Sequence, residues 1–183
     1  EGPRETERFG LSGMPYCGAC ALAAQCLVTL GDYTGAGALI RQGERVAHAA
    51  NHLYSTVPLA IVRGRLLVSK GSAIEALAVL EPTVALCRER KFAGQLMHAL
   101  TFLAHALVLG GRASEGIALA REAVELHENA RAFADHSMML GALAETYLYA
   151  GQLEAAEARA HEALRFAARH RERGYEASVR WTL

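Results

Sequence analysis

Apolar residues recur along the chain at helical spacing in a series of long stretches, and regularly placed glycines divide these stretches into pairs. The glycines lie 40 residues apart, at Gly31, Gly71, Gly111 and Gly151. A constant period of this length indicates repeated helical hairpins, each of which buries its apolar face against its neighbours.

The residues around each glycine fall into columns of constant size. Large residues stand four positions before the glycine, and small ones stand seven before, five after and twelve after it. Because small side chains let two helix backbones approach while large ones fill the space beside them, this alternation favours packed helix pairs. The large column is Leu27, Leu67, Leu107 and Tyr147; the small columns are Ala24, Gly64, Ala104 and Ala144, then Ala36, Ala76, Gly116 and Ala156, then Gly43, Thr83, Ala123 and Ala163.

This pattern predicts an all-α fold of four helical hairpins followed by a truncated ninth helix. The helices are expected at 14–30 with 34–50, 55–70 with 73–90, 94–109 with 113–129, and 134–150 with 153–171. The repeats would cover 12–51, 52–91, 92–131 and 132–172 of a single domain spanning 1–183, with a partial repeat at 173–183. Since the closing glycine of the partial repeat would fall near position 191, we expect the chain to be a fragment of a larger protein.

Local signals set the expected helix ends. The glycine at the end of each first helix suits a left-handed C-cap. Ser72 and Glu75 form a capping-box pattern before the fourth helix. Ser55 is positioned to cap the third helix, which would leave Pro58 in its first turn. Pro82 falls in the middle of the fourth helix, where it is expected to kink or locally unwind the chain.

Composition and charge exclude several classes of function. Apolar residues make up 52% of the chain and charged ones 21%, which is enough apolar material for a core. With 19 basic and 19 acidic residues the net charge is zero, so there is no electrostatic footprint for nucleic acid or an anionic membrane. The longest apolar run, 100–109, is too short to span a bilayer, and 1–8 carries charges in place of a signal-peptide core. We therefore expect a cytoplasmic protein without nucleic-acid or membrane partners.

The cysteines and histidines do not form a ligand pattern. Cys17, Cys20 and Cys26 lie within one predicted helix, without the second close pair that a zinc site usually has. His48 and His52 are four residues apart, but no further ligand stands at metalloprotease spacing. A phosphate-binding glycine loop and a nucleophile elbow are also missing from the sequence. The sequence thus predicts free thiols in a reducing compartment, no metal, no cofactor and no enzymatic activity.

The repeat pattern resembles the tetratricopeptide (TPR) repeat, lengthened from its usual period of about 34 residues by longer helices. The small columns and the turn at Gly31, Asp32 and Tyr33 favour TPR over HEAT and armadillo repeats, whose periods of about 40–47 residues make them the alternative. Segments 8–11, 109–112, 145–154 and 171–177 are similar to the C-terminal TPR region of large bacterial signalling proteins with a class III adenylate/guanylate cyclase domain and a STAND-type ATPase domain. Related arrays occur in LuxR- or MalT-like transcriptional activators. The resemblance implies a right-handed α-α superhelix, a TPR-like solenoid, that serves as a sensor or interaction region.

One column is polar in every repeat, although the helix that carries it is otherwise mostly apolar. By analogy with TPR folds, in which the first helices line a concave groove, this register would face the groove. Thr101 lies one turn before the column and Tyr149 one turn after it. Such a surface would bind an extended peptide or a helix through hydrogen bonds. The candidate groove residues are Gln25, Arg65, His105 and Glu145, six residues before each glycine, together with Thr101 and Tyr149.

Three functional hypotheses follow. The leading one is a protein-interaction and regulatory scaffold of a larger bacterial signalling protein, which binds a protein or peptide segment or another domain of its parent chain. The second is a small-molecule-sensing domain. The third is homodimerisation of a transcriptional regulator through the face around Trp181. Four aromatic residues would line the pocket of the second: Tyr33, Phe102, Tyr147 and Tyr149.

Overall fold

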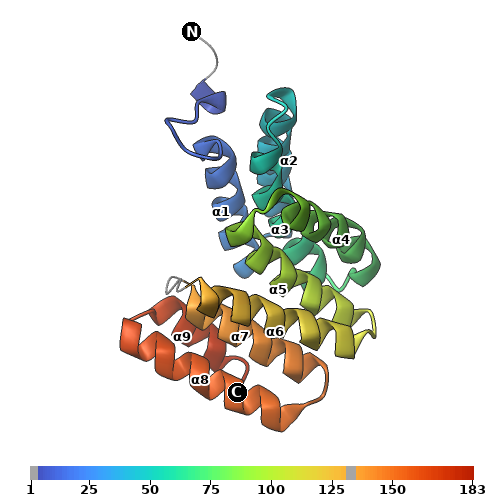
Figure 1. The fold of residues 1–183 in the computed structure, drawn as a ribbon, viewed down its shortest axis with the longest axis vertical. Helices are drawn as coiled ribbons and strands as arrows, with labels where there is room; N and C mark the ends of the chain where they lie inside the picture. The colour runs from blue at the N-terminus through green and yellow to red at the C-terminus, as the bar shows by residue number, and fades with distance from the viewer. Residues whose placement is uncertain (1–3, 131–134) are drawn as a thin grey trace. The chain divides into compact units, whose positions relative to one another are not determined.

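The computed structural model describes residues 4–130 and 135–183, and in those ranges the chain consists of helices joined by turns and short loops, with no strand (Figure 1). None of the helices in these ranges is long and apolar enough to cross a membrane. The predicted helix ends are confirmed to within two residues, except that position 134 lies outside the described residues. The elements are η1 (Arg4–Thr6), α1 (Pro15–Thr29), α2 (Tyr33–Ala49), α3 (Leu53–Ser69), α4 (Ala73–Arg90), α5 (Ala93–Leu109), α6 (Ala113–Asn129), α7 (His136–Tyr149), α8 (Leu153–His170) and α9 (Arg173–Arg180).

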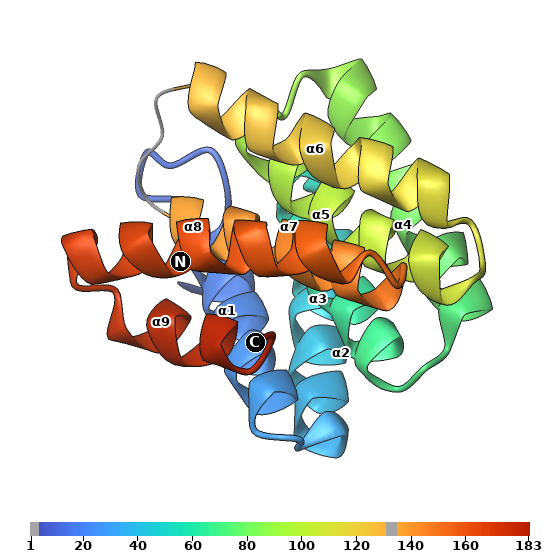
Figure 2. The ribbon, with the colours of Figure 1, turned by 90° about the horizontal axis from the view of Figure 1, so that it is seen from below.

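The chain divides into two compact units, Glu1–Gln95 and Leu96–Leu183, which we call the N-terminal and C-terminal units. In the N-terminal unit, α1 packs against both α2 and α3, and α3 packs against α4. In the C-terminal unit, α7 packs against α6, α8 and α9, and Figure 2 shows α9 running beside α8. Each unit thus repeats the contact of a first helix with its own second helix and with the next first helix. The expected repeat limits within one domain stay a prediction, and the limit at 131/132 falls outside the described residues.

The turn inside each hairpin has the same geometry in all four repeats. Gly31 has a φ of +80°, and its N–H donates to the Val28 carbonyl (3.1 Å), while the Asp32 N–H donates to the Leu27 carbonyl (2.9 Å). This pair of bonds is the Schellman motif, whose left-handed residue favours glycine because a Cβ is disfavoured there. The predicted left-handed glycines are therefore confirmed. The same backbone bonds recur at Gly71, Gly111 and Gly151, with φ angles of +76°, +82° and +73°.

The small columns lie where the helices approach most closely. Gly64 on α3 faces Leu80 on α4, and a Cβ on this glycine would lie 2.4 Å from the leucine side chain. Gly116 on α6 approaches main chain, because a Cβ there would lie 2.7 Å from the carbonyl oxygen of Ala104 on α5. The predicted packing of small residues between helices is thus confirmed. Every member of the three columns is buried, including Ala24, Gly64, Ala104 and Ala144.

The start of α3 differs from the prediction. The helix begins at residue 53, so Ser55 lies inside it and does not cap it, and Pro58 lies beyond its first turn. The hydroxyl of Ser55 instead accepts the N–H of Met14 (2.8 Å), a donor at the start of α1 that the helix itself cannot satisfy. Pro58 leaves the carbonyl of Tyr54 without its helical donor, and the side-chain amide of Gln95 donates to that carbonyl (3.3 Å). Long-range partners of this kind leave no trace in local spacing.

For α4, the capping prediction is wrong and the unwinding expected at Pro82 does not occur. Ser72 occupies the N-cap position, but its side chain makes no capping hydrogen bond. The backbone at Ser72 (ψ +67°) resembles that at Arg112 (ψ +53°) and Gln152 (ψ +73°), so the hairpin turn sets the start of the second helix whichever residue stands there. Pro82 does not unwind the helix, which runs unbroken over Ala73–Arg90, because the packing of the surrounding turns outweighs one missing hydrogen bond.

The predicted ninth helix is present as α9. Val179 is its buried residue and faces α7, where a Cβ on Gly141 would lie 2.8 Å from the valine side chain. Trp181, at the C-cap, is almost fully exposed. The first helix of the partial repeat therefore packs on α7 as α3 packs on α1.

Candidate functional site

In the N-terminal unit, the polar column connects the first helices of neighbouring repeats. Arg65 on α3 donates to the hydroxyl of Thr29 on α1 (3.0 Å), and that hydroxyl donates to the carbonyl of Gln25 (3.1 Å). Gln25 and Arg65 are both partly exposed. The structure thus links these two predicted residues through Thr29, at a surface that solvent reaches.

In the C-terminal unit, the same column places an imidazole beside a carboxylate. His105 on α5 is 5% exposed, and its Nε2 lies 3.0 Å from the Ala142 carbonyl oxygen on α7. Because a carbonyl oxygen only accepts, Nε2 carries the hydrogen in this contact. Glu145, one turn along α7, has its Oε2 3.9 Å from the same nitrogen and its side chain 33% exposed. The buried imidazole supports one side of the carboxylate, and solvent reaches the other.

Aromatic rings flank His105. The ring of Tyr149 lies 5.8 Å from the imidazole and that of Phe102 lies 6.2 Å from it, both close to perpendicular. Tyr149 is 60% exposed. Partial desolvation, followed by the negative charge of Glu145, raises the pKa of the Tyr149 hydroxyl, so this hydroxyl remains a hydrogen-bond donor at neutral pH.

Thr101 is placed differently from the other candidates. It is 4% exposed, and its hydroxyl donates to the Met97 carbonyl (3.0 Å) and lies 3.3 Å from the sulfur of Met139. These contacts hold the hydroxyl in the interior between α5 and α7. The accessible part of the predicted site in this unit is therefore Glu145 and Tyr149 above His105, which we call the α5–α7 surface.

Two of the four aromatic residues considered for a small-molecule pocket hold helices together. The hydroxyl of Tyr147 on α7 accepts a hydrogen bond from Arg121 on α6 (2.7 Å), and the residue is buried. The hydroxyl of Tyr33 on α2 donates to the Ser69 carbonyl at the end of α3 (3.4 Å). Both side chains thus have structural partners within their own unit.

A cluster of rings in the C-terminal unit was not predicted. His127 on α6 and His136 on α7 stack at 5.3 Å, with their Nδ1 atoms 3.3 Å apart. His136 meets the ring of Phe166 on α8 edge to face (4.6 Å), and Phe166 stacks on His170 (4.2 Å). We call these four rings the imidazole cluster. Its members occupy different positions in the repeat, so no spacing in the sequence connects them.

Burial lowers the pKa of two histidines in this region. For His98 on α5, desolvation is the largest cause; Asp135 opposes it and His127 adds to it. For His136, desolvation comes first and His127 again lowers the pKa. The neutral imidazole is therefore favoured at both positions. Three carboxylates oppose the shift of His136: Glu128, Glu162 and Glu172.

The described residues contain no group of three or more His, Cys, Asp or Glu side chains arranged to hold a metal ion. All four cysteines are free thiols. Burial is the main cause that raises the pKa of Cys17, Cys20 and Cys87, so these thiols stay protonated at neutral pH.

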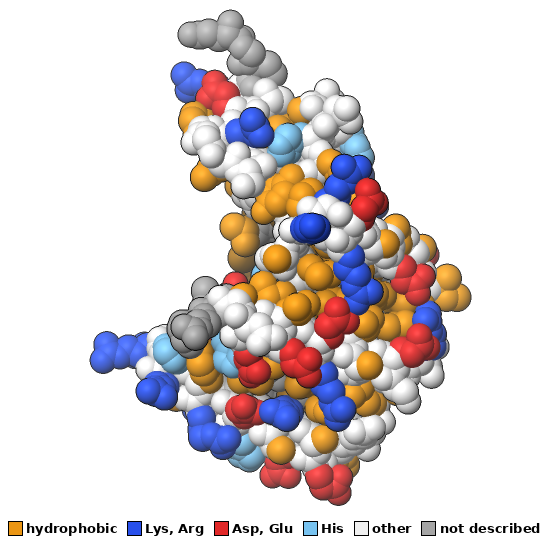
Figure 3. All heavy atoms as spheres, viewed as in Figure 1, with side chains coloured by type: hydrophobic (Ala, Val, Ile, Leu, Met, Phe, Trp, Pro, Cys, Tyr) orange, Lys and Arg blue, Asp and Glu red, His pale blue; other side chains and the backbone are white. Residues whose placement is uncertain are grey.

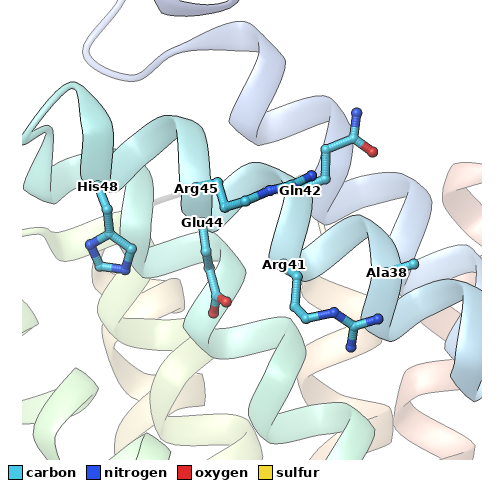
Figure 4. Close-up of a pocket in the computed structure, with 6 residues that line it drawn as sticks. All are labelled: Ala38, Arg41, Gln42, Glu44, Arg45 and His48. Atoms are coloured by element: carbon cyan, nitrogen blue, oxygen red, sulfur yellow. The ribbon is translucent and has the colours of Figure 1, made fainter.

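A shallow, open hollow lies along α2, a second helix, whereas the polar column lies on first helices (Figure 4). Its volume is about 740 Å³. Spacing in the sequence singles out His48 only as a possible metal ligand, and none of its neighbours in this hollow. The signal in the sequence that could have found them is the charge of each second helix. The lining residues are Ala38, Arg41, Gln42, Glu44, Arg45 and His48.

Solved structures of TPR-like repeats resemble this chain. One is a signal transduction ATPase with numerous domains (STAND) from Pyrococcus horikoshii that has a tetratricopeptide repeat sensor, with a TM-score of 0.62 and 15% identity over 90% of this chain and 26% of that one. The others are two crystal structures of a putative kinesin light chain of Podosopora anserina with nearly identical TPR-like repeats, with a TM-score of 0.60 and 18% identity over 82% of this chain and 74% of that one. No protein-family model and no curated protein matches the sequence. The chain therefore has an all-α, TPR-like solenoid fold, and it spans about a quarter of the STAND protein.

Proposed function

We propose that this chain is a non-catalytic interaction region of a larger signalling protein, in which the first helices bind a peptide or protein segment. The TPR-like fold supports this role, because stacked helical repeats present extended surfaces for binding. The small share of the STAND protein that the chain spans supports a place within a longer polypeptide. The proposed signalling role rests on that neighbour, which is a signal transduction ATPase.

The α5–α7 surface carries the proposal. Glu145 is 33% exposed, with His105 lying 3.9 Å behind its carboxylate. A side chain supported in this way loses less conformational freedom on binding than an unsupported one. Tyr149 adds an exposed ring and a hydroxyl beside it. The arrangement suits a segment that donates a backbone or basic N–H to Glu145 and packs an apolar side chain on Tyr149.

The test compares the wild-type chain with Arg65→Ala, Glu145→Ala and the double variant on an array of immobilised peptides. We expect the double variant to lose at least about tenfold in affinity for the peptides that the wild type selects, equal to about 1.4 kcal/mol. Glu154→Ala is the matched control, because Glu154 is an exposed carboxylate on α8. Peptides that bind Arg65→Ala, Glu145→Ala and the double variant as tightly as they bind the wild type would contradict the assignment to the first helices. Unchanged circular dichroism would show that each variant is folded.

A further inference from the structure

The second helices of the four hairpins differ in charge. α2 has two arginines against one glutamate, α4 two against three, α6 one against four, and α8 three against three. On the face drawn in Figure 3, acidic side chains are frequent over α6 and α8 and sparse over the part that contains α1 and α2. α2 is thus the second helix on which basic residues outnumber acidic ones.

The basic side chains of α2 follow one face. Arg41, Arg45 and His48 are four and three residues apart and are all exposed. In Figure 4, Arg41 and His48 project to the same side of the helix, with Glu44 between them, and the side chain of Arg45 runs along the helix toward Gln42. The guanidinium of Arg41 lies back along the helix, since a Cβ on Gly37 would lie 3.3 Å from its Nη1. These residues line the open hollow of about 740 Å³.

The acidic residue on this helix does not neutralise the face. Glu44 accepts two hydrogen bonds from Arg63 on α3, one from Nε (3.0 Å) and one from Nη2. The negative charge of Glu44 is therefore matched within the protein. Neither Arg41 nor Arg45 has a hydrogen bond or an ion pair with any other residue that the structure describes. Two positive charges one helical turn apart remain available to a ligand.

We propose that the basic face of α2 docks an acidic peptide segment of a partner protein. Two guanidinium groups on residues whose Cβ atoms are about 6 Å apart suit a pair of carboxylates on one segment, each held by charge-assisted hydrogen bonds. The open hollow leaves room for the backbone of that segment.

The observations favour carboxylates over nucleic acid. The chain has no net charge, and the face offers two arginines, which is short of the extended basic surface that a phosphate backbone requires. The site lies on a second helix, so it is separate from the first-helix surface and does not depend on the proposed function.

The experiment measures the fluorescence anisotropy of a short labelled Glu/Asp peptide titrated with the full chain, next to its Gln/Asn counterpart. We expect binding of the acidic peptide alone, weakened by added salt. Arg41→Gln with Arg45→Gln is expected to weaken it at least about tenfold. Arg165→Gln with Arg169→Gln on α8 is the matched control, because these two arginines have the same spacing and are also exposed. That pair is expected to change the affinity less than about twofold.

A third variant is expected to strengthen the binding of the acidic peptide instead of weakening it. Glu44→Gln removes the negative charge from the hollow and frees Arg63, so the affinity should rise by about two- to threefold. Equal weakening by the two double variants would overturn the proposal, as would absence of binding or stronger binding of an oligonucleotide than of the acidic peptide. Loss of binding in Arg65→Ala with Glu145→Ala, but not in Arg41→Gln with Arg45→Gln, would move the segment to the first helices. Matching thermal unfolding curves would show that the variants are folded.

Discussion

In the N-terminal unit, arginine side chains connect the helices of neighbouring repeats, whereas in the C-terminal unit buried and half-buried imidazoles do so as well, beside Arg121, which donates to Tyr147 between α6 and α7. Arg63 binds Glu44 between α3 and α2, and Arg65 reaches α1. In the other unit His105 donates to a carbonyl of α7, and His127 contacts His136 between α6 and α7. The same hairpin therefore accommodates two kinds of polar contact.

This difference shows which positions the hairpin fixes and which it leaves free. The small columns are buried in both units, and all four hairpin turns use the same Schellman bonds. The polar positions vary, because a contact between neighbouring helices needs a partner but not a particular chemistry. Surface arginines keep their charge in water at little cost, whereas desolvation lowers the pKa of His98 and His136, so we expect the C-terminal unit to be sensitive to acid.

We expect the largest loss of stability when a methyl group is added at a close helix contact of each unit. In Gly116→Ala the new Cβ would lie 2.7 Å from the main-chain oxygen of Ala104, so α5 or α6 must move. In Gly64→Ala it would meet the buried side chain of Leu80, so a side chain and not main chain must shift. We expect free energies of unfolding lower by about 3 kcal/mol for Gly116→Ala and about 2 kcal/mol for Gly64→Ala.

Urea unfolding followed by circular dichroism measures both values. The informative result is which of the two variants loses more free energy of unfolding. A larger loss for Gly64→Ala would mean that the main chain at Ala104 yields more easily than the buried side chain of Leu80.

The fold could be predicted from the sequence because its determinants are periodic. Gly31 and its equivalents mark the turns, and the columns that include Ala24 and Gly64 mark the helix contacts. The errors at the start of α3 arose where a distant residue replaced a local partner. Ser55 accepts the N–H of Met14 instead of capping its own helix, and no local pattern encodes that contact.

The candidate site could be predicted only in part. Glu145 and Tyr149 on α7 are accessible and lie beside His105, and the groove register expected for them stays a prediction. Thr101 lies on α5 and is as buried as His105, because this stretch of α5 is packed in the interior of the unit. The imidazole cluster joins residues from different repeat positions, and this kind of contact depends on how far each helix extends along its neighbour.

We expect acid to destabilise the C-terminal unit more than the N-terminal unit. The pKa values of His98 and His136 are lowered from the ordinary 6.5 in the folded state, chiefly by desolvation. Near and below that pH the unfolded chain binds more protons than the folded one, so the free energy of unfolding falls as the pH falls. Above about pH 6.5 this contribution to stability is fully present. We expect amide hydrogen exchange, corrected for intrinsic rates, to accelerate more in α6–α8 than in α1–α4 between about pH 7.5 and 5.5.

Variants connect this effect to the two histidines. His98→Gln with His136→Asn should flatten the pH dependence of stability, whatever its effect on stability at neutral pH. His161→Asn, at an exposed position on α8, is the control and should leave the pH dependence unchanged. Equal acceleration of exchange in both units would show that the imidazoles do not distinguish them.

A single substitution in α1 is expected to stabilise the N-terminal unit alone, by a small amount. Gly18 lies inside α1, and a Cβ there would have no atom within 4 Å, in contrast to Gly64 and Gly116. Gly18→Ala should therefore raise the stability of the N-terminal unit by about 0.5–1 kcal/mol, because alanine restricts the unfolded chain and favours the helix. Differential scanning calorimetry measures the change. If the two units unfold independently, the transition of the N-terminal unit moves up while the other stays in place; a shift of one shared transition would instead show that the units unfold together.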